Sequence, residues 1–494
     1  MKVNRKRICS IIVKNNSFFV SLHPLLPCYP RILFNFKPNY DNDMAKQGTP
    51  TELGTEKISK LLVQYSIPAI IAMTASSLYN MVDSIFIGHG VGRLGISGLT
   101  LTFPLMNLAA AFGSLVGVGA ATLVSVRLGQ KDYDSANKVL GNVIILNLII
   151  GITFSIVFLC FLDPVLYFFG ASEQTLPYAR DYMQVILLGN VVTHLYLGLN
   201  AILRSSGNPQ KAMYATIATV IVNTALNPLF IFAFGWGIKG SAIATVLAQV
   251  LSLAWQIHFF SRKTSFMHFQ KGIFRLRKKI VLGTLAIGMS PFMMNLASCF
   301  IVILINQGLK TYGGDLAIGA FGIVNRIVFL FVMIVMGLNQ GMQPIAGYNY
   351  GAKLYPRVTH VLKMTIIMAI SVMTVGFVIG ELFPYYAVSI FTSDAELLQR
   401  AEEGLRIVTI FFPIVGFQMV ASNFFQSIGM ASKAIFLSLT RQLIFLIPCL
   451  IILPHLFNLG GKGIWISMPV ADLSAVIVSG FMLWRELKKF KTMA

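Results

Sequence analysis

Hydrophobic side chains make up 56% of this 494-residue chain and charged ones only 12%, and a soluble globular protein carries about twice that charged fraction. A net charge of +21 is compatible with nucleic-acid binding, but the lysines and arginines lie between long apolar runs, as the positive-inside rule expects. Composition therefore predicts a protein embedded in a lipid bilayer and argues against nucleic acid as a partner.

The first 56 residues differ from the rest of the chain. They mix basic residues with scattered aromatics and prolines, and they lack the apolar core and cleavage site of a signal peptide. Met44 opens a polar lead-in to the first hydrophobic segment. We expect translation to start at Met44, which would make the preceding residues a misassigned extension. The alternative is a disordered cytoplasmic tail.

Twelve long apolar runs follow. Lipid offers backbone groups no hydrogen-bonding partner, so each run must be helical or part of a closed barrel, and these runs are too long and continuous for barrel strands. The sequence therefore predicts an all-α polytopic membrane protein with twelve transmembrane helices. The expected spans are 61–88, 97–125, 138–162, 179–203, 211–234, 240–261, 281–308, 317–343, 360–384, 403–428, 434–456 and 463–485.

The distribution of basic residues predicts the orientation. With a cytoplasmic N-terminus, the inner connections hold most of the lysines and arginines, and the outer loops hold mainly acids. Both termini should therefore face the cytoplasm. The longest connection is basic and polar, and it divides the chain into two sets of six spans. The expected parts are an extension 1–56, an N-terminal lobe 57–262, a linker 263–280, a C-terminal lobe 281–487 and a basic tail 488–494.

The chain matches itself at an offset of about 222 residues. Glycines and lysines recur in this register. The matched pairs are Gly119 and Gly341, Gly129 and Gly351, Lys131 and Lys353, Gly207 and Gly429, and Lys211 and Lys433. A repeat of six spans begins and ends on one side of the membrane, so the two copies share an orientation. We therefore expect two six-helix lobes related by a parallel internal repeat, with substrate bound near the membrane midplane.

No enzymatic motif is present. The five cysteines lie at no metal-ligand spacing, and no Walker A, G-x-S-x-G or H-E-x-x-H element occurs. We expect neither enzymatic activity nor a cofactor.

Asp83 is one of very few carboxylates inside an expected span. Placing a lone charge there costs about 2.5–3.5 kcal/mol, so an acid within the membrane is a functional candidate. Desolvation favours binding of a proton, whereas surrounding oxygens would favour a small cation such as Na+. The alternative is a structural hydrogen bond to a neighbouring helix.

Several segments resemble the multidrug and toxic compound extrusion (MATE) family, in its DinF/MepA-like branch. The most specific is GLNQGMQPIAGYNYGAK, from Gly337 to Lys353; LYNMVDSIFIGHGVG, AILRSSGNPQKA and GAFGIVNRI support it. The resemblance covers nearly everything after about residue 57. It implies twelve helices in two lobes and export of organic cations in exchange for H+ or Na+.

The resemblance also implies a coupling-ion site in the N-terminal lobe. Asp83 falls on the coupling carboxylate, and Asn223, Asn227 and Thr245 match further positions of the cation site. Where the family usually has an aspartate, this chain has Asn227, which removes a negative charge and leaves the choice between H+ and Na+ open. Apart from Na+ at Asp83, no metal is expected. The alternative role of the two amides is to hydrogen-bond neighbouring helices to each other.

Polar, aromatic and methionine side chains suit a cavity that accepts varied flat cations. The expected cavity residues are Tyr79, Met73, Gln340, Gln343, Asn325 and Arg326. Asp472 and Arg441 lie at comparable depth in neighbouring spans and are a plausible ion pair, for which we favour a structural role. His194 could relay protons, although a structural histidine is the simpler interpretation.

The function predicted is cation-coupled antiport of organic cations and drugs by alternating access, in a monomer of the bacterial inner (cytoplasmic) membrane. The alternative is a lipid-linked oligosaccharide flippase of the same superfamily. Such a flippase should have a more cationic cavity, and here only Arg326 and Arg441 lie clearly within spans.

Overall fold

The computed structural model describes residues 51–263, 265–456 and 459–493, without the side chains of Leu78, Asn80, Met81 and Asp315. The expectations for residues 1–50, including the start at Met44, lie outside these residues. Each apolar run of the described chain forms helix, as the need to satisfy backbone hydrogen bonds in lipid requires.

The described part of the N-terminal half, from residue 51 on, contains eight helices and one π-helical turn. They are α1 (Glu52–Thr55), α2 (Ile58–Gly90), α3 (Arg93–Gly129), α4 (Tyr133–Cys160), α5 (Leu162–Phe168), α6 (Leu176–Ser205), α7 (Pro209–Pro228), the π-helical turn η1 (Leu229–Ala233) and α8 (Gly237–Ser261).

The C-terminal half follows a segment over 262–277. Its elements are α9 (Lys278–Gly351), α10 (Tyr355–Leu382), α11 (Pro384–Ser389), α12 (Ala395–Thr409), α13 (Phe412–Ser427), α14 (Ala431–Leu439), the π-helical turn η2 (Thr440–Leu446), α15 (Ile447–Ile452) and α16 (Gly461–Met493). The long helix α9 holds the seventh and eighth spans, which meet at Gly314 (φ 64°, ψ −160°).

Eleven helices of the described chain are long and apolar enough to cross a membrane, or twelve if one bent pair counts as a span. That pair, α12 and α13, is bent by 55°, inside the run 403–428 expected as a continuous tenth span. Pro413 in the first turn of α13 explains the break, since its ring clashes with the carbonyl of residue 409, where α12 ends.

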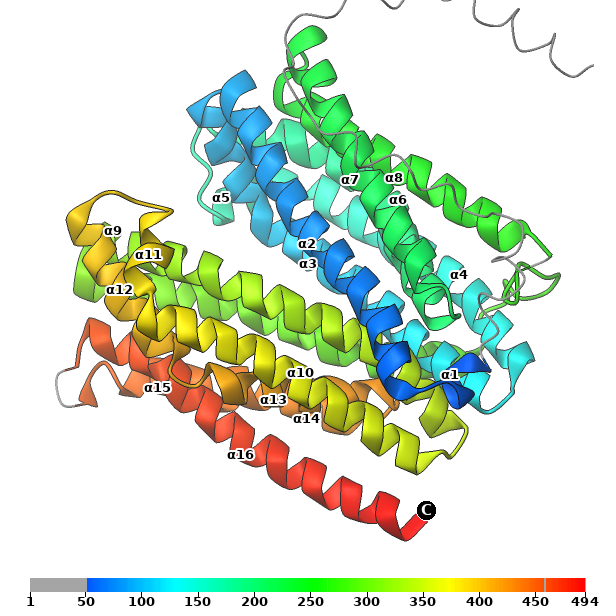
Figure 1. Ribbon diagram of the computed structural model, residues 1–494. Coiled ribbons are helices and arrows are strands. Elements are labelled where there is room, and N and C mark those ends of the chain that lie inside the picture. The colour runs from blue at the N-terminus through cyan, green and yellow to red at the C-terminus, as the bar shows by residue number, and fades with distance from the viewer. Residues whose placement is uncertain (1–50, 264, 457–458, 494) are drawn as a thin grey trace, which may run out of the picture. The chain divides into compact units, whose positions relative to one another are not determined.

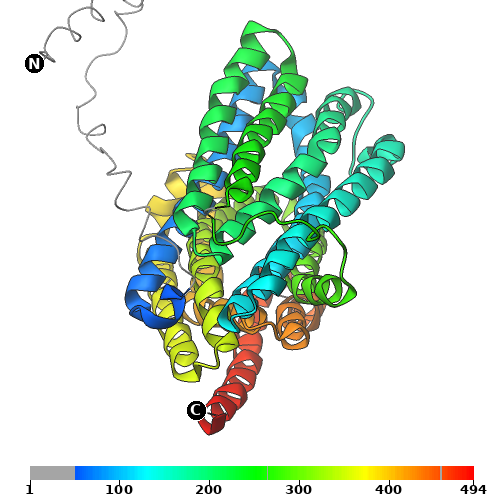
Figure 2. The same cartoon turned by 90° about the vertical axis from the view of Figure 1, so that its right-hand side faces the viewer.

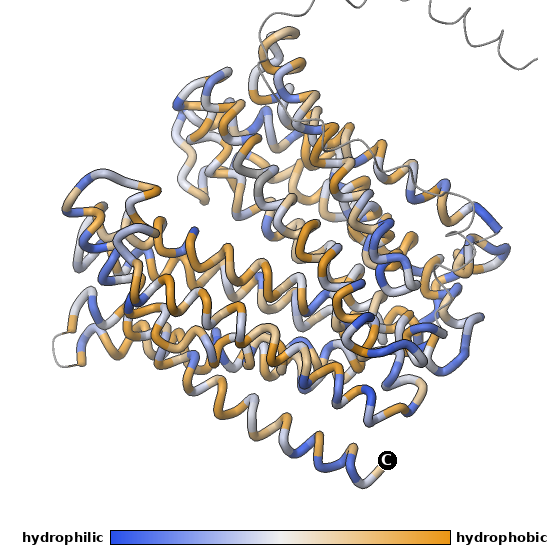
Figure 3. The backbone as a smooth tube through the Cα atoms, viewed as in Figure 1, coloured by the Kyte–Doolittle hydropathy of each residue, from blue (hydrophilic) through white to orange (hydrophobic). Residues whose placement is uncertain are grey.

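The helices form two groups, α2 to α8 and α9 to α16 (Figure 1). The groups lie side by side near α1 and diverge toward α5, α11 and α12, and the view turned by 90° shows the same grouping (Figure 2). Apolar residues dominate the middle of the helices, and hydrophilic ones gather near many of the helix ends (Figure 3). We call the groups the N-terminal and C-terminal lobes.

Unusual backbone conformations recur at the repeat offset. Lys131 and Lys353, 222 residues apart, both have φ of 59°, which non-glycine residues rarely adopt. Gly207 and Gly429, at the same spacing, also have positive φ. These positions end equivalent helices in the two lobes. The backbone thus supports the parallel repeat predicted from sequence.

Glycines let the lobes approach each other closely. A Cβ on Gly119 of α3 would overlap the carbonyl oxygen of Thr284 in α9, and one on Gly288 would overlap that of Leu115. In the related crossing, Gly341 packs directly against α2. Small residues are what allow such backbone contact between membrane helices.

Two short segments cross from one lobe to the other. Leu53 of α1 is buried, and its carbonyl accepts hydrogen bonds from Asn349 Nδ2 (2.9 Å) and Arg357 Nη2 (3.2 Å) of the C-terminal lobe. On the linker, the Arg277 amide donates to Asn142 Oδ1 of α4 at 2.9 Å. Residues 52–55 therefore pack onto the lobes, although the sequence placed them in the extension 1–56.

Candidate functional site

Asp83 lies in α2 and points away from the C-terminal lobe. Ile70 of α2 contacts Gly337 of α9, and at 100° per residue Asp83 lies about 140° round the helix from Ile70. The Asp83 carboxylate is 4% exposed and accepts a hydrogen bond of 2.5 Å from Ser241 Oγ in α8. The acid is thus enclosed within the N-terminal lobe.

A hydrogen-bonded network surrounds Asp83. Thr245 Oγ1 lies 3.0 Å from the Tyr79 hydroxyl and accepts from Asn223 Nδ2 at 3.1 Å. Asn227 Nδ2 donates to Asn223 Oδ1 at 2.8 Å. The structure therefore brings together the four residues that the sequence proposed for ion coupling, from α2, α7 and α8.

One buried oxygen atom of the network has no hydrogen-bond partner among the described residues. Asn227 faces the Asp83 carboxylate, and its Oδ1 is buried without a hydrogen-bond partner among the described residues. The described chain places no lysine or arginine in an ion pair with Asp83. A buried carboxylate beside an unpartnered amide oxygen can hold a proton, a small cation with a preference for oxygen ligands, or water.

Helical spacing positions these side chains. Asn223 and Asn227 are four residues apart in α7, as are Ser241 and Thr245 in α8, so each pair shares one helix face. Gly240 brings α8 close to η1, the π-helical turn that follows α7, because a Cβ there would lie 2.9 Å from the Phe230 carbonyl oxygen.

Two assignments differ from the sequence analysis. Ser241, which was not singled out, makes the closest hydrogen bond to Asp83; its position four residues before Thr245 was the available signal. Tyr79, expected in the substrate cavity, lies within the ion-coupling network.

Buried acids of the C-terminal lobe have basic partners. Arg441 Nε donates to Asp472 Oδ1 at 2.5 Å, which confirms the predicted pair. Glu486 pairs with Lys433, and Lys489 lies 3.8 Å from it. Each of these carboxylates is neutralised by a side chain of its own lobe.

Two predicted cavity glutamines lie between the lobes. Gln340 Nε2 lies 3.2 Å from the sulfur of Met73, and Gln343 Nε2 donates to Thr122 Oγ1 at 2.7 Å. Asn325 and Arg326, in the same helix, are exposed. The six predicted cavity residues thus occupy three places: the ion-coupling network, the lobe interface and an exposed stretch of α9.

His194 is fully buried in α6. Its Nε2 lies 3.0 Å from the Ala109 carbonyl oxygen, whereas Nδ1 has no partner in the part of the chain that the structure describes. The bond to Ala109 fixes the ring between α3 and α6, which agrees with a structural histidine.

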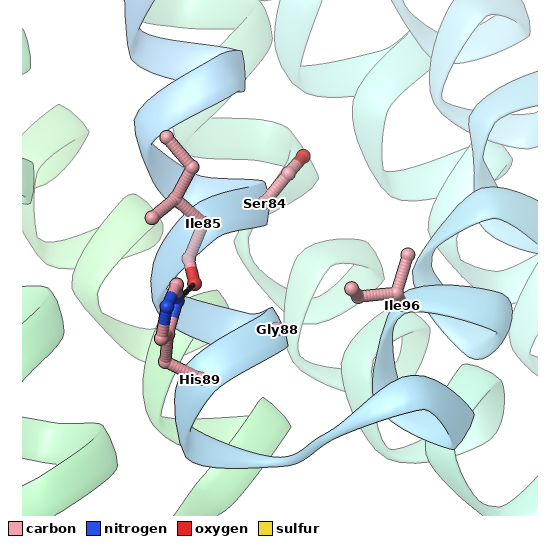
Figure 4. A pocket seen from close by; sticks show the side chains of 5 residues that line it. All are labelled: Ser84, Ile85, Gly88, His89 and Ile96. Atoms are coloured by element: carbon pink, nitrogen blue, oxygen red, sulfur yellow. Dashed lines mark hydrogen bonds between the residues drawn. The ribbon is translucent and has the colours of Figure 1, made fainter. Parts of the chain in front are cut away.

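A pocket of about 410 Å³ lies between α2 and α3 near their connecting turn (Figure 4). Ser84, Ile85, Gly88 and His89 line it from α2 and Ile96 from α3. Figure 4 shows His89 hydrogen-bonded to the Ile85 carbonyl and Ile96 facing the pocket across from Ser84 and Gly88. Asp83 does not line this pocket.

Two repeated six-helix lobes in the membrane are the architecture of many membrane transporters. The sequence family described as MatE matches the chain twice, over residues 68–229 and 286–451. The chain belongs to this MATE family, and the two matches fall on the two lobes.

Curated relatives and solved structures agree with this family. The multidrug export protein MepA of Staphylococcus haemolyticus is 27% identical over 427 residues, covering 86% of this chain and 93% of that protein. MepA of Staphylococcus aureus is 28% identical over 420 residues, covering 85% and 92%. An outward-facing multidrug resistance MATE transporter of the MOP superfamily superimposes with a TM-score of 0.84 at 25% identity, covering 90% of this chain and 99% of that one. A MATE structure in a bent conformation gives a TM-score of 0.86 with the same identity and coverage.

Proposed function

We propose that this chain exports drugs and other amphipathic organic compounds, organic cations among them, in exchange for H+ or Na+. The observation that carries the proposal is Asp83, a buried carboxylate in a hydrogen-bonded network without a basic partner among the described residues. The multidrug export proteins to which the chain is similar support the substrate class.

The proposed cycle couples Asp83 to the movement of the lobes. A cation from outside binds Asp83 and neutralises it, which changes its hydrogen bonding to α8 and weakens the conformation that holds the drug. The drug then leaves to the outside, and release of the cation to the cytoplasm resets the lobe. A membrane potential of about 150 mV supplies about 3.5 kcal/mol per charge, which sustains a concentration ratio of about several hundredfold.

The proposed setting is the cytoplasmic membrane, with both termini in the cytoplasm and the protein acting as a monomer. Basic residues in the connections around 127–138, 204–211 and 262–279 support this orientation. We propose no cofactor besides the coupling ion.

Ethidium export from liposomes tests the function. Purified wild type, Asp83→Asn and a control, Asp134→Asn, are compared with a Na+ or a proton gradient applied separately. Asp134 is an exposed acid in the first turn of α4 that pairs with Lys138. We expect one gradient to drive export by wild type and the control, and Asp83→Asn to lose at least about 90% of the rate because the coupling carboxylate is gone.

Wild-type export that needs neither gradient, or equal export by Asp83→Asn at equal reconstitution, would contradict the proposal. Movement of a pyrophosphate-linked lipid without export of any organic compound would favour the flippase instead.

A further inference from the structure

Arg326 lies on the side of α9 that faces the N-terminal lobe. It precedes Gly337, which packs against Ile70 of α2, by 11 residues, and 11 residues bring an α-helix back to within about 20° of the same direction. Gln340, on the same side of the helix, contacts Met73 of α2. The contacts of Gly337 and Gln340 with α2 fix which face of α9 is turned toward the other lobe.

Along this face of α9, contact with α2 is lost from Gly337 toward the break at Gly314. Gly337 is buried against α2, whereas Arg326 and Leu330, on the same helix face, are exposed, the latter by 60%. Figure 1 shows α2 and α9 diverging in this direction. Arg326 is therefore exposed on the face of α9 that is turned toward α2, about 15 Å along the helix from Leu316, where the eighth span begins.

No acid neutralises Arg326. Its side chain forms no ion pair or hydrogen bond within the described part of the chain. In α2, α3 and α9, which meet across the lobe interface, the sequence contains only two acids, Asp83 and Asp315. Asp83 is buried on the far side of α2, and Asp315 follows the break at Gly314. Lys310 is a second exposed cation on the first half of α9. It lies about 40° round the helix from Gly288, which packs against α3 of the N-terminal lobe.

An exposed arginine without an acidic partner, within a span that otherwise carries few charges, is a place where a negatively charged group can bind. The guanidinium presents a planar fork of donors that matches a carboxylate.

We propose that Arg326 binds an anionic group of the exported compound, a carboxylate in the simplest case. Amphipathic zwitterions and organic anions are then favoured over plain organic cations. The inference rests on the proposed export function and names its substrate class. It also separates two tasks: the coupling cation binds inside the N-terminal lobe, and the substrate's negative group binds α9 of the C-terminal lobe.

Two dyes with the same ring system test this assignment. Rhodamine 110 carries a free benzoate, and rhodamine 123 is its methyl ester and a plain cation. Binding of each dye to purified protein in nanodiscs is measured by fluorescence polarisation for wild type, Arg326→Gln and Arg326→Lys. The control is Arg485→Gln, which removes an exposed arginine far along α16.

We expect Arg326→Gln to weaken rhodamine 110 binding about tenfold and Arg326→Lys about threefold, with rhodamine 123 and the control within about twofold of wild type. The proposal is overturned if wild type fails to bind rhodamine 110, or if Arg326→Gln leaves it unchanged or weakens both dyes equally.

Gradient-driven flux of the same dyes in liposomes is a separate readout. Selective binding without flux would reject the proposed export function while supporting Arg326 as an anion site. Flux with unselective binding would do the reverse.

Discussion

The two lobes share a repeat, but their buried acids have different partners. In the N-terminal lobe, Asp83 has hydroxyl and amide neighbours and no basic partner in the described chain. In the C-terminal lobe, Asp472 is paired with Arg441 and Glu486 with Lys433. A side chain of the same lobe thus supplies the counter-charge of each buried acid in the C-terminal lobe. In the proposed cycle, an exchangeable cation supplies the counter-charge of Asp83, so only the N-terminal lobe would change its charge during transport.

The repeat register shows how this difference arises. The residue 222 positions after Asn223 is Phe445, and the one 223 positions after Thr245 is Met468. Apolar side chains thus replace network members in the C-terminal lobe. Arg441 and Asp472 do not align with network residues in this register, because they correspond to Thr219 and Gln249 of the N-terminal lobe.

The largest effect is expected when the ion pair of Arg441 and Asp472 is broken. Arg441→Gln leaves Asp472, whose side chain is 7% exposed, without its counter-charge, and it should destabilise the protein by about 3 kcal/mol. Asp83→Asn removes an unpaired acid and should leave stability unchanged or slightly higher. Thermal unfolding in one detergent compares the two. Equal destabilisation by both would contradict the distinction between the lobes.

A smaller effect is expected when the hydrogen bond from Ser241 to Asp83 is removed. Ser241→Ala removes a donor that stabilises the empty, charged carboxylate, so the coupling cation should bind about tenfold more tightly and be released more slowly. Export rates measured over a series of cation concentrations give both quantities. Ser252→Ala is the control, because Ser252 is a buried serine of the same helix that bonds Thr219 instead. An identical response in both variants would refute the role of Ser241.

The smallest expected effect concerns a helix cap that α4 has and the equivalent helix α10 lacks. Asp132 caps α4 by accepting from the Ser135 amide at 3.1 Å, whereas Leu354, 222 residues later, provides no side-chain cap for α10. Partial burial alone would raise the pKa of Asp132, but the hydrogen bonds from Ser135 and the charge of Arg127 outweigh it and lower the pKa.

Asp132→Ala should cost about 1 kcal/mol. Because the folded pKa is lowered, the cap contributes fully above the unfolded pKa of about 4 and is lost as pH falls through the folded value. Hydrogen exchange of the first turn of α4 at pH 6 and pH 3.5 measures this loss, and no pH dependence would contradict it.

Much of the fold was predictable because membrane burial imposes long apolar helices and the repeat appears as matched glycines and lysines. The bend between α12 and α13 was not recognised, since hydropathy is insensitive to it, although Pro413 marks the place. The break at Gly314 falls inside the connection 309–316 that the sequence placed between the seventh and eighth spans.

The site was predictable in part. Asp83 stands out because acids are rare within spans, and Asn223 and Asn227 share a helix face by their spacing. Ser241 was missed because a serine in a membrane helix usually bonds its own backbone and carries no distinct signal. The separation of Asp83 from Arg326 depends on which helix faces meet, and only packed helices reveal that.

The central claim is that Asp83 holds the exchanged cation. The most direct test adds a transported organic compound to purified protein in weakly buffered solution and follows proton release with a pH dye and Na+ release with an ion-selective electrode. The account predicts that wild type releases one kind of cation when the compound binds and that Asp83→Asn releases none while still binding it. Equal release by Asp83→Asn, or binding by wild type without any release, would contradict the account.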